Sequence, residues 1–172
     1  MSGPATPAHV APEPVRGAPE RRRKFLVVVD KTPESRVAVR FVTRRAQHTG
    51  GRVTLFCVVE HDDFQQWRGV AELMKDEAHQ EAENLVYEAA RAVNDLAGII
   101  PELVIMDGRK TECLLELIKS DRDISILVLA AGTAKEGPGP LVSAFATRAA
   151  ANPIPITIVP GGLSDAEIDA LA

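Results

Sequence analysis

Aromatic side chains are scarce in this sequence, because Phe, Trp and Tyr make up only 4% of its 172 residues. The core must therefore be built from Val, Leu, Ile and Ala, and a hydrophobic content of 45% is enough for one such domain. No apolar run approaches the roughly 20 residues that span a bilayer. The N-terminus also lacks the apolar segment of a signal peptide. These absences predict a cytoplasmic domain without a membrane segment.

Chemically reactive residues are few as well. The two cysteines, Cys57 and Cys113, form neither a metal-binding spacing nor a disulfide framework, so we interpret them as core residues and not as redox groups. No histidine has a catalytic neighbour, and neither serine nor cysteine lies in a nucleophile elbow. The net charge of -4 argues against a dedicated nucleic-acid binder. The sequence therefore predicts no catalytic residue and no metal site, and it favours a protein that is not an enzyme.

The two ends of the chain differ from its middle. Residues 1–23 hold five of the twelve prolines and almost no large apolar group, which predicts a disordered tail. The Arg21–Lys24 run is interpreted as solvated charge before the first strand, with contact to an acidic partner as the alternative. At the other end, residues 163–172 form a short helix. Ser164 and Glu167 are spaced as its capping box, and Leu163 and Ile168 as its hydrophobic staple. So short a helix must dock on something to be stable.

Residues 24–162 alternate between apolar β-branched runs and segments of helical period, which predicts one α/β domain with a parallel sheet. The expected strands are Phe25–Val29, Arg52–Glu60, Leu103–Met106, Ile124–Ala131 and Ile156–Val159. The expected helices run from an N-cap at Thr32 to Gly50, from Phe64 to Leu96, from an N-cap at Thr111, and from the loop 132–140 to about Ala151.

The fourth strand is followed by a loop rich in glycine and proline, Gly132–Pro140. Ligand crevices of open α/β sheets lie at the carboxyl ends of buried strands. We therefore expect this loop to form one wall of any site.

Over Lys24–Pro160 the sequence resembles the universal stress protein family. The resemblance rests on the order and spacing of several segments: Phe25–Asp30 with a Pro-Glu-Ser-Arg helix start, Val53–Val59, Asp107-Gly108, Thr111–Ile118, Leu127–Gly132 and Pro153–Pro160. It implies a five-stranded parallel sheet of order 3-2-1-4-5, helices on both faces and an adenine-nucleotide-hydrolase-like α/β fold. In one branch of the family ATP lies across strands one and four, and other members bind no nucleotide.

By this resemblance Asp30 matches an acidic residue that faces the nucleoside, and Val58 and Val59 match the region whose backbone meets adenine. An alternative for Asp30 is that it caps local backbone. The candidate nucleotide-binding set is Asp30, Val58, Val59, Gly132, Thr133, Lys135, Gly137, Gly139 and Ser143.

The phosphate loop departs from the pattern of nucleotide-binding relatives, which is Gly-x2-Gly-x9-Gly followed by Ser or Thr. Here Lys135 stands in the place of the second glycine and Val142 in the place of the third, and the loop is about three residues shorter. Pro138 and Pro140 also lack N–H groups that a phosphate cradle would use.

The sequence therefore predicts a regulatory or binding module of the stress response with weak or no nucleotide binding. The alternative is an ATP-binding member with slow ATPase activity that uses Asp30, Gly132 and Ser143, with ATP or another adenine nucleotide as cofactor. The resemblance also implies a homodimer formed through the last strand, Ile154–Val159, with Ile168 and Leu171 of the final helix beside the seam. Alternatively this helix folds back over its own sheet edge. A protein partner is expected, but the sequence does not identify it.

Overall fold

The structure is a computed structural model that describes residues 22–60 and 68–172. Almost all of the predicted tail and the expected helix start at Phe64 lie outside the described residues.

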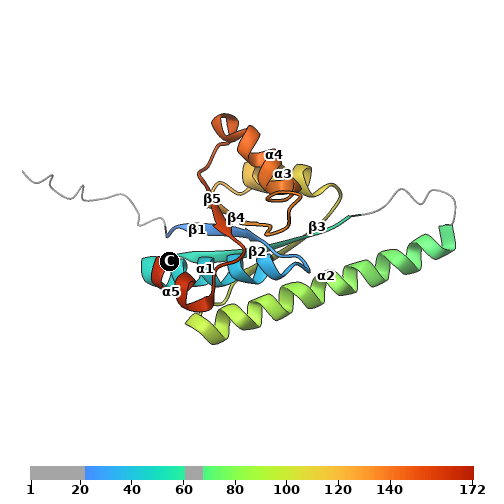
Figure 1. The fold of residues 1–172 in the computed structure, drawn as a ribbon. Coiled ribbons are helices and arrows are strands. Elements are labelled where there is room, and N and C mark those ends of the chain that lie inside the picture. The colour runs from blue at the N-terminus through green and yellow to red at the C-terminus, as the bar shows by residue number, and fades with distance from the viewer. Residues whose placement is uncertain (1–21, 61–67) are drawn as a thin grey trace, which may run out of the picture.

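Five parallel strands form one sheet in the order β3-β2-β1-β4-β5 (Figure 1). This confirms the fold expected from the sequence. Every neighbouring pair is parallel, and β1 lies in the middle between β2 and β4. The strands are β1 (Lys24–Val28), β2 (Arg52–Val59), β3 (Glu102–Asp107), β4 (Ile124–Ala131) and β5 (Ile156–Pro160).

The helices cover both faces of the sheet (Figure 1). One face carries α1 (Pro33–Thr49), α2 (Arg68–Ala97) and α5 (Asp165–Leu171), and the other carries α3 (Lys110–Ser120) and α4 (Pro140–Thr147). Side chains of β1 alternate between two apolar cores, because Val27 packs towards α1 and α2 whereas Leu26 and Val28 pack towards α3 and α4. Within the described residues, no helix is long and apolar enough to cross a membrane.

The helices begin and end where the sequence predicts, with two exceptions. Thr32 caps α1 through its side chain, and Gly50 ends the helix in the left-handed conformation with φ 64°. The expected N-cap at Thr111 is wrong, because α3 begins at Lys110 and the extended Arg109 precedes it without a side-chain cap. The chain already turns at Gly108, directly after β3, so the helix starts earlier than the threonine suggested.

The fourth helix is shorter than expected. It ends at Thr147, and a 3-10 turn at Ala149–Ala151 follows. Asn152 is extended because it precedes Pro153, whose ring disfavours a helical residue before it.

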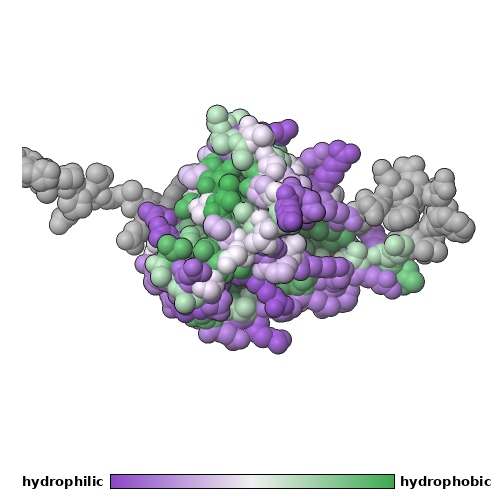
Figure 2. All heavy atoms as spheres, viewed as in Figure 1, coloured by the Kyte–Doolittle hydropathy of each residue, from purple (hydrophilic) through white to green (hydrophobic). Residues whose placement is uncertain are grey.

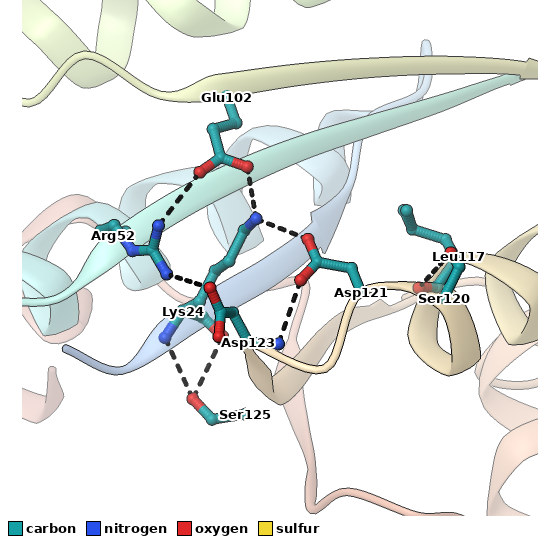
Figure 3. A network of polar contacts seen from close by, with 8 residues as sticks. All are labelled: Lys24, Arg52, Glu102, Leu117, Ser120, Asp121, Asp123 and Ser125. Carbon is teal, nitrogen blue, oxygen red and sulfur yellow. Dashed lines mark hydrogen bonds and ion pairs between the residues drawn. The ribbon is translucent and has the colours of Figure 1, made fainter. Parts of the chain in front are cut away.

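Lys24 contradicts the expectation of a solvated charge run, since it is only 4% exposed. Its ammonium group pairs with Glu102 and lies 2.5 Å from Asp121 Oδ2 (Figure 3). Arg52 joins the same cluster through Glu102 and Asp123, at 3.5 and 3.1 Å. These side chains connect the amino-terminal ends of β1, β2 and β3 with the segment that enters β4. We call them the Lys24 cluster: Lys24, Arg52, Glu102, Asp121 and Asp123.

The contacts within this cluster favour the charged forms of Lys24 and Asp121. Burial alone would raise the pKa of Asp121, but hydrogen bonds from Lys24 and from the Asp123 amide outweigh it and hold that pKa below its ordinary value. Burial alone would likewise lower the pKa of Lys24, yet its two carboxylate partners raise it. Both groups are therefore charged at neutral pH.

Replacement of Lys24 by Met should destabilise the domain by about 2 kcal/mol. Removing one partner of a fully buried ion pair costs roughly 3–5 kcal/mol, and Asp121 and Glu102 keep some contact with solvent. Urea unfolding would measure the loss, with Lys119→Met on the exposed side of α3 as the control. Equal stability of the two variants would contradict a structural role for the cluster.

The final helix docks on α1. Its capping box is confirmed, because Ser164 Oγ accepts from the Glu167 amide while the Glu167 carboxylate accepts from the Ser164 amide at 2.8 Å. Asp169 accepts from Arg40 at 2.6 and 2.9 Å and also from Arg44 at 3.0 and 3.3 Å. Ile168 is fully buried within its own chain, so the expectation that it lies at an intersubunit seam is wrong.

The attachment of α5 should depend on pH. Hydrogen bonds from Arg40 and Arg44 lower the pKa of Asp169 from 3.8 to about 2, so its contribution to stability is complete above pH 3.8 and lost as the pH falls towards 2. The stability difference between the wild type and Asp169→Asn should therefore be largest above that range and shrink below it. Denaturant unfolding at several pH values measures this, with the exposed Asp95→Asn as control. A difference independent of pH would refute the assignment.

Candidate functional site at the carboxyl ends of β1 and β4

The strand order reverses between β1 and β4, and ligand crevices of open α/β sheets lie at such a point. A crevice is present there, but its volume is only about 130 Å³. Pockets for small organic ligands usually measure about 300–1,000 Å³. Its walls come from the β1–α1 connection, the β4–α4 loop and the start of α3: Val28, Asp30, Thr32, Glu34, Ser35, Lys110, Leu129, Ala130, Gly132, Pro138, Gly139, Pro140, Leu141 and Val142.

Asp30 lies at the floor of the crevice and caps the local backbone. Its Oδ1 accepts from the Thr32 amide at 2.9 Å and from the Thr32 hydroxyl at 2.5 Å. Its own amide donates to Ser35 Oγ at 3.1 Å. The side chain thus holds the turn that starts α1, which is the alternative that the sequence left open for this residue.

Two N–H groups of the β4–α4 loop donate to carbonyl groups of the same loop. The Gly132 amide donates to Pro138 O at 3.0 Å, and the Gly137 amide donates to Ala134 O at 3.2 Å. Pro138 and Pro140 have no N–H group at all. A phosphate cradle is made of free amides that point at the ligand, and Gly132, Gly137, Pro138 and Pro140 contribute no such amide.

Glu34 lines the crevice from the α1 side. Its Oε1 accepts from the Thr133 amide at 3.3 Å and from the Thr133 hydroxyl at 3.2 Å. Hydrogen bonds from its own backbone amide and from that of Thr133 lower its pKa, so the carboxylate is ionised at neutral pH. Gly161 permits this approach, because a Cβ there would lie 2.2 Å from Glu34 Cγ and 2.4 Å from Ala131 O. The loop amide that an incoming anion would seek is thus bonded to a carboxylate.

Two loop glycines are required by conformation. Gly137 and Gly139 have φ of 109° and 99°, where a side chain would be strained. Val142, which stands where relatives carry the third glycine, is instead buried in the core beneath α4 together with Phe145. Val142 therefore has a packing role at this position.

The structure brings together only part of the candidate set. Asp30, Gly132 and Gly139 line the crevice, whereas Thr133, Lys135, Gly137, Ser143, Val58 and Val59 do not belong to its lining. Lys135 and Ser143 are exposed, and Val59 is buried with its carbonyl accepting from the Gly108 amide at 3.1 Å.

The two cysteines are not activated. Burial raises the pKa of the Cys57 thiol, and it raises that of Cys113 as well, so neither is an activated thiolate. In the part of the chain that the structure describes, no cluster of His, Cys, Asp or Glu side chains could hold a metal ion.

The model of the universal stress protein family matches residues 21–160. The chain belongs to this family. Comparison with curated proteins gives no match.

Solved universal stress proteins share the fold. UspA from Lactobacillus plantarum is 18% identical with a TM-score of 0.69, and the alignment covers 82% of this chain and 99% of that one. A universal stress protein in complex with cAMP is 20% identical with a TM-score of 0.56, over 81% of this chain and 98% of the other. An Arabidopsis thaliana family member with AMP bound is 14% identical with a TM-score of 0.58, over 80% and 91%.

Sequence reasoning missed two residues of this universal stress protein's crevice, Glu34 and Lys110. Glu34 had a usable signal, because the predicted cap at Thr32 puts it in the first turn of a helix that leaves β1 beside β4. Lys110 was placed outside its helix by the wrong cap at Thr111. Only the observed start of α3 brings its side chain to the crevice.

Proposed function

We propose that this universal stress protein is a cytoplasmic regulatory or binding module of the stress response that does not bind ATP tightly. The observation that carries the proposal is the pair of hydrogen bonds from Thr133 to the Glu34 carboxylate, which lines a crevice of only about 130 Å³. A triphosphate would have to displace this carboxylate or approach it closely. Either event is unfavourable for a polyanion, since like charges repel at short range.

An ATP-binding protein with slow ATPase activity is the second candidate. It is supported by Lys110 at the crevice and by the relatives solved with cAMP and AMP. It would use Asp30, Gly132 and Ser143, and Ser143 would have to turn towards the crevice from its exposed position. The number of loop amides bonded internally favours the first candidate.

Calorimetric titration of ATP into the purified protein tests this choice. We expect a dissociation constant no tighter than roughly 100 μM, equivalent to about -5.5 kcal/mol. Glu34→Gln should strengthen binding roughly fivefold, because it removes a charge without removing bulk. Asp30→Ala should have no effect on that weak affinity. A low-micromolar constant that is lost in Asp30→Ala would overturn the proposal and support the ATPase.

We also propose a homodimer formed through β5, through which the module would reach a further protein partner. This strand lies at the sheet edge and pairs with β4 alone among the described strands. Figure 2 shows a hydrophobic surface over the region of β5 below α4. Ile158 contributes to this edge and is 43% exposed, and an apolar strand edge favours pairing with another chain. The final helix packs against α1 and leaves this edge available.

Ile158→Lys should convert the dimer into a monomer at micromolar concentration, because a charge at the centre of a twofold strand pair faces its own copy. Sedimentation velocity measures the change. Ile100→Lys, at a site that is 89% exposed and far from β5 in the sheet order, is the matched control and should remain dimeric. A monomeric wild type would refute the dimer directly.

A further inference from the structure

A second and larger cavity lies on the α3 and α4 side of the sheet. Its volume is about 520 Å³, within the range of sites for small organic ligands. Three of its lining residues are cationic, two at the start of α3 and one at the end of α4. Two lining residues are carboxylates. The lining consists of Glu60, Arg109, Lys110, Thr111, Glu112, Leu115, Pro140, Leu141 and Arg148.

These cations are loosely engaged within the protein. Arg109 lies 3.5 Å from Glu112, and Lys110 lies 3.9 Å from Glu60. Arg148 makes no side-chain hydrogen bond or ion pair with the described residues. By contrast, Arg40 holds Asp169 through two hydrogen bonds of 2.6 and 2.9 Å. The five donors of the Arg148 guanidinium are thus free for an external acceptor.

Part of the cavity lining is apolar. Leu115, Leu141 and Pro140 contribute it, and Thr111 adds a hydroxyl at the beginning of α3. Lys110, Pro140 and Leu141 also line the small crevice, so the two cavities adjoin. A ligand held here would therefore present an anionic group to the cations and a less polar body to the leucines.

We propose that this cavity binds a small phosphomonoester, with its phosphate held by Arg148, Arg109 and Lys110. A phosphate dianion has three oxygens, so it can accept from an arginine fork and from a lysine together. The cations surround one hollow and do not form a track, and the net charge of the chain is -4, which disfavours a nucleic acid. The inference deepens the proposed function, because it supplies the ligand class of the binding module at a place other than the small crevice.

Calorimetric titration of the full chain with ribose 5-phosphate, AMP and adenosine tests the proposal. We expect at least one of the two esters to bind, adenosine not to bind, and the affinity to fall with added salt. Arg148→Ala should weaken ester binding by about tenfold, the loss of one charge-assisted contact. Arg45→Ala, an exposed arginine of α1, is the matched control and should bind like the wild type. A preference for AMP over ribose 5-phosphate would show that the base rests on the apolar part of the lining.

Three results would overturn the inference: no ester binding below about 1 mM, equal binding by the Arg148 and Arg45 variants, or binding abolished by Asp30→Ala. The last result would locate the ligand in the small crevice. The two proposals can be refuted separately. Tight ATP binding that requires Asp30 would refute the proposed function. Ester binding that does not change in Arg148→Ala would refute only this site.

Discussion

The proposed function depends on the contact between Glu34 and Thr133 at the carboxyl ends of the strands. This contact joins the first turn of α1 to the loop after β4 across the point where the strand order reverses. The absence of a side chain at Gly161 permits this contact, and the Gly132 amide beside the small crevice is bonded within the loop. A carboxylate there performs inside the protein the role that an anionic ligand would otherwise fill, since it accepts from the loop amide and hydroxyl.

The amino-terminal and carboxyl-terminal ends of the strands, called here the amino edge and the carboxyl edge, carry different kinds of side-chain contact. At the amino edge, the Lys24 cluster ties four successive strand starts together with charged groups, and the ionised forms are the ones that hydrogen bonding favours. At the carboxyl edge, charges line cavities and are only partly paired. One fold can hold many functions because such edge residues change without disturbing the strands. In this chain three cations line the cavity on the α3 and α4 side, whereas Asp30 and Glu34 are the acidic residues that line the crevice beside β1.

Most of the fold could be predicted from the sequence, because continuous apolar runs, the Thr32-Pro33 helix start and the Gly50 stop each have a local physical cause. Three errors have other origins. The burial of Lys24 depends on Glu102 and Asp121, which are distant in sequence. The start of α3 depends on the turn at Gly108, which overrides the preference of Thr111 for a cap. Glu34 contacts the loop after β4 only because β4 lies beside β1. Contacts between distant segments decided the burial of Lys24 and the position of Glu34 beside β4, whereas the start of α3 was decided by the nearby turn at Gly108.

Val142 has a packing role at the position where the family pattern expects a glycine. A glycine at that position would serve an anion by letting its backbone approach, but it would leave the space beneath α4 empty. Val142 is instead buried beside Phe145, in the same core as Leu26 and Leu129. Burial of a valine side chain contributes about 2 kcal/mol relative to exposure, which exceeds the small net value of a single surface hydrogen bond to a ligand. At this position packing therefore favours valine over glycine.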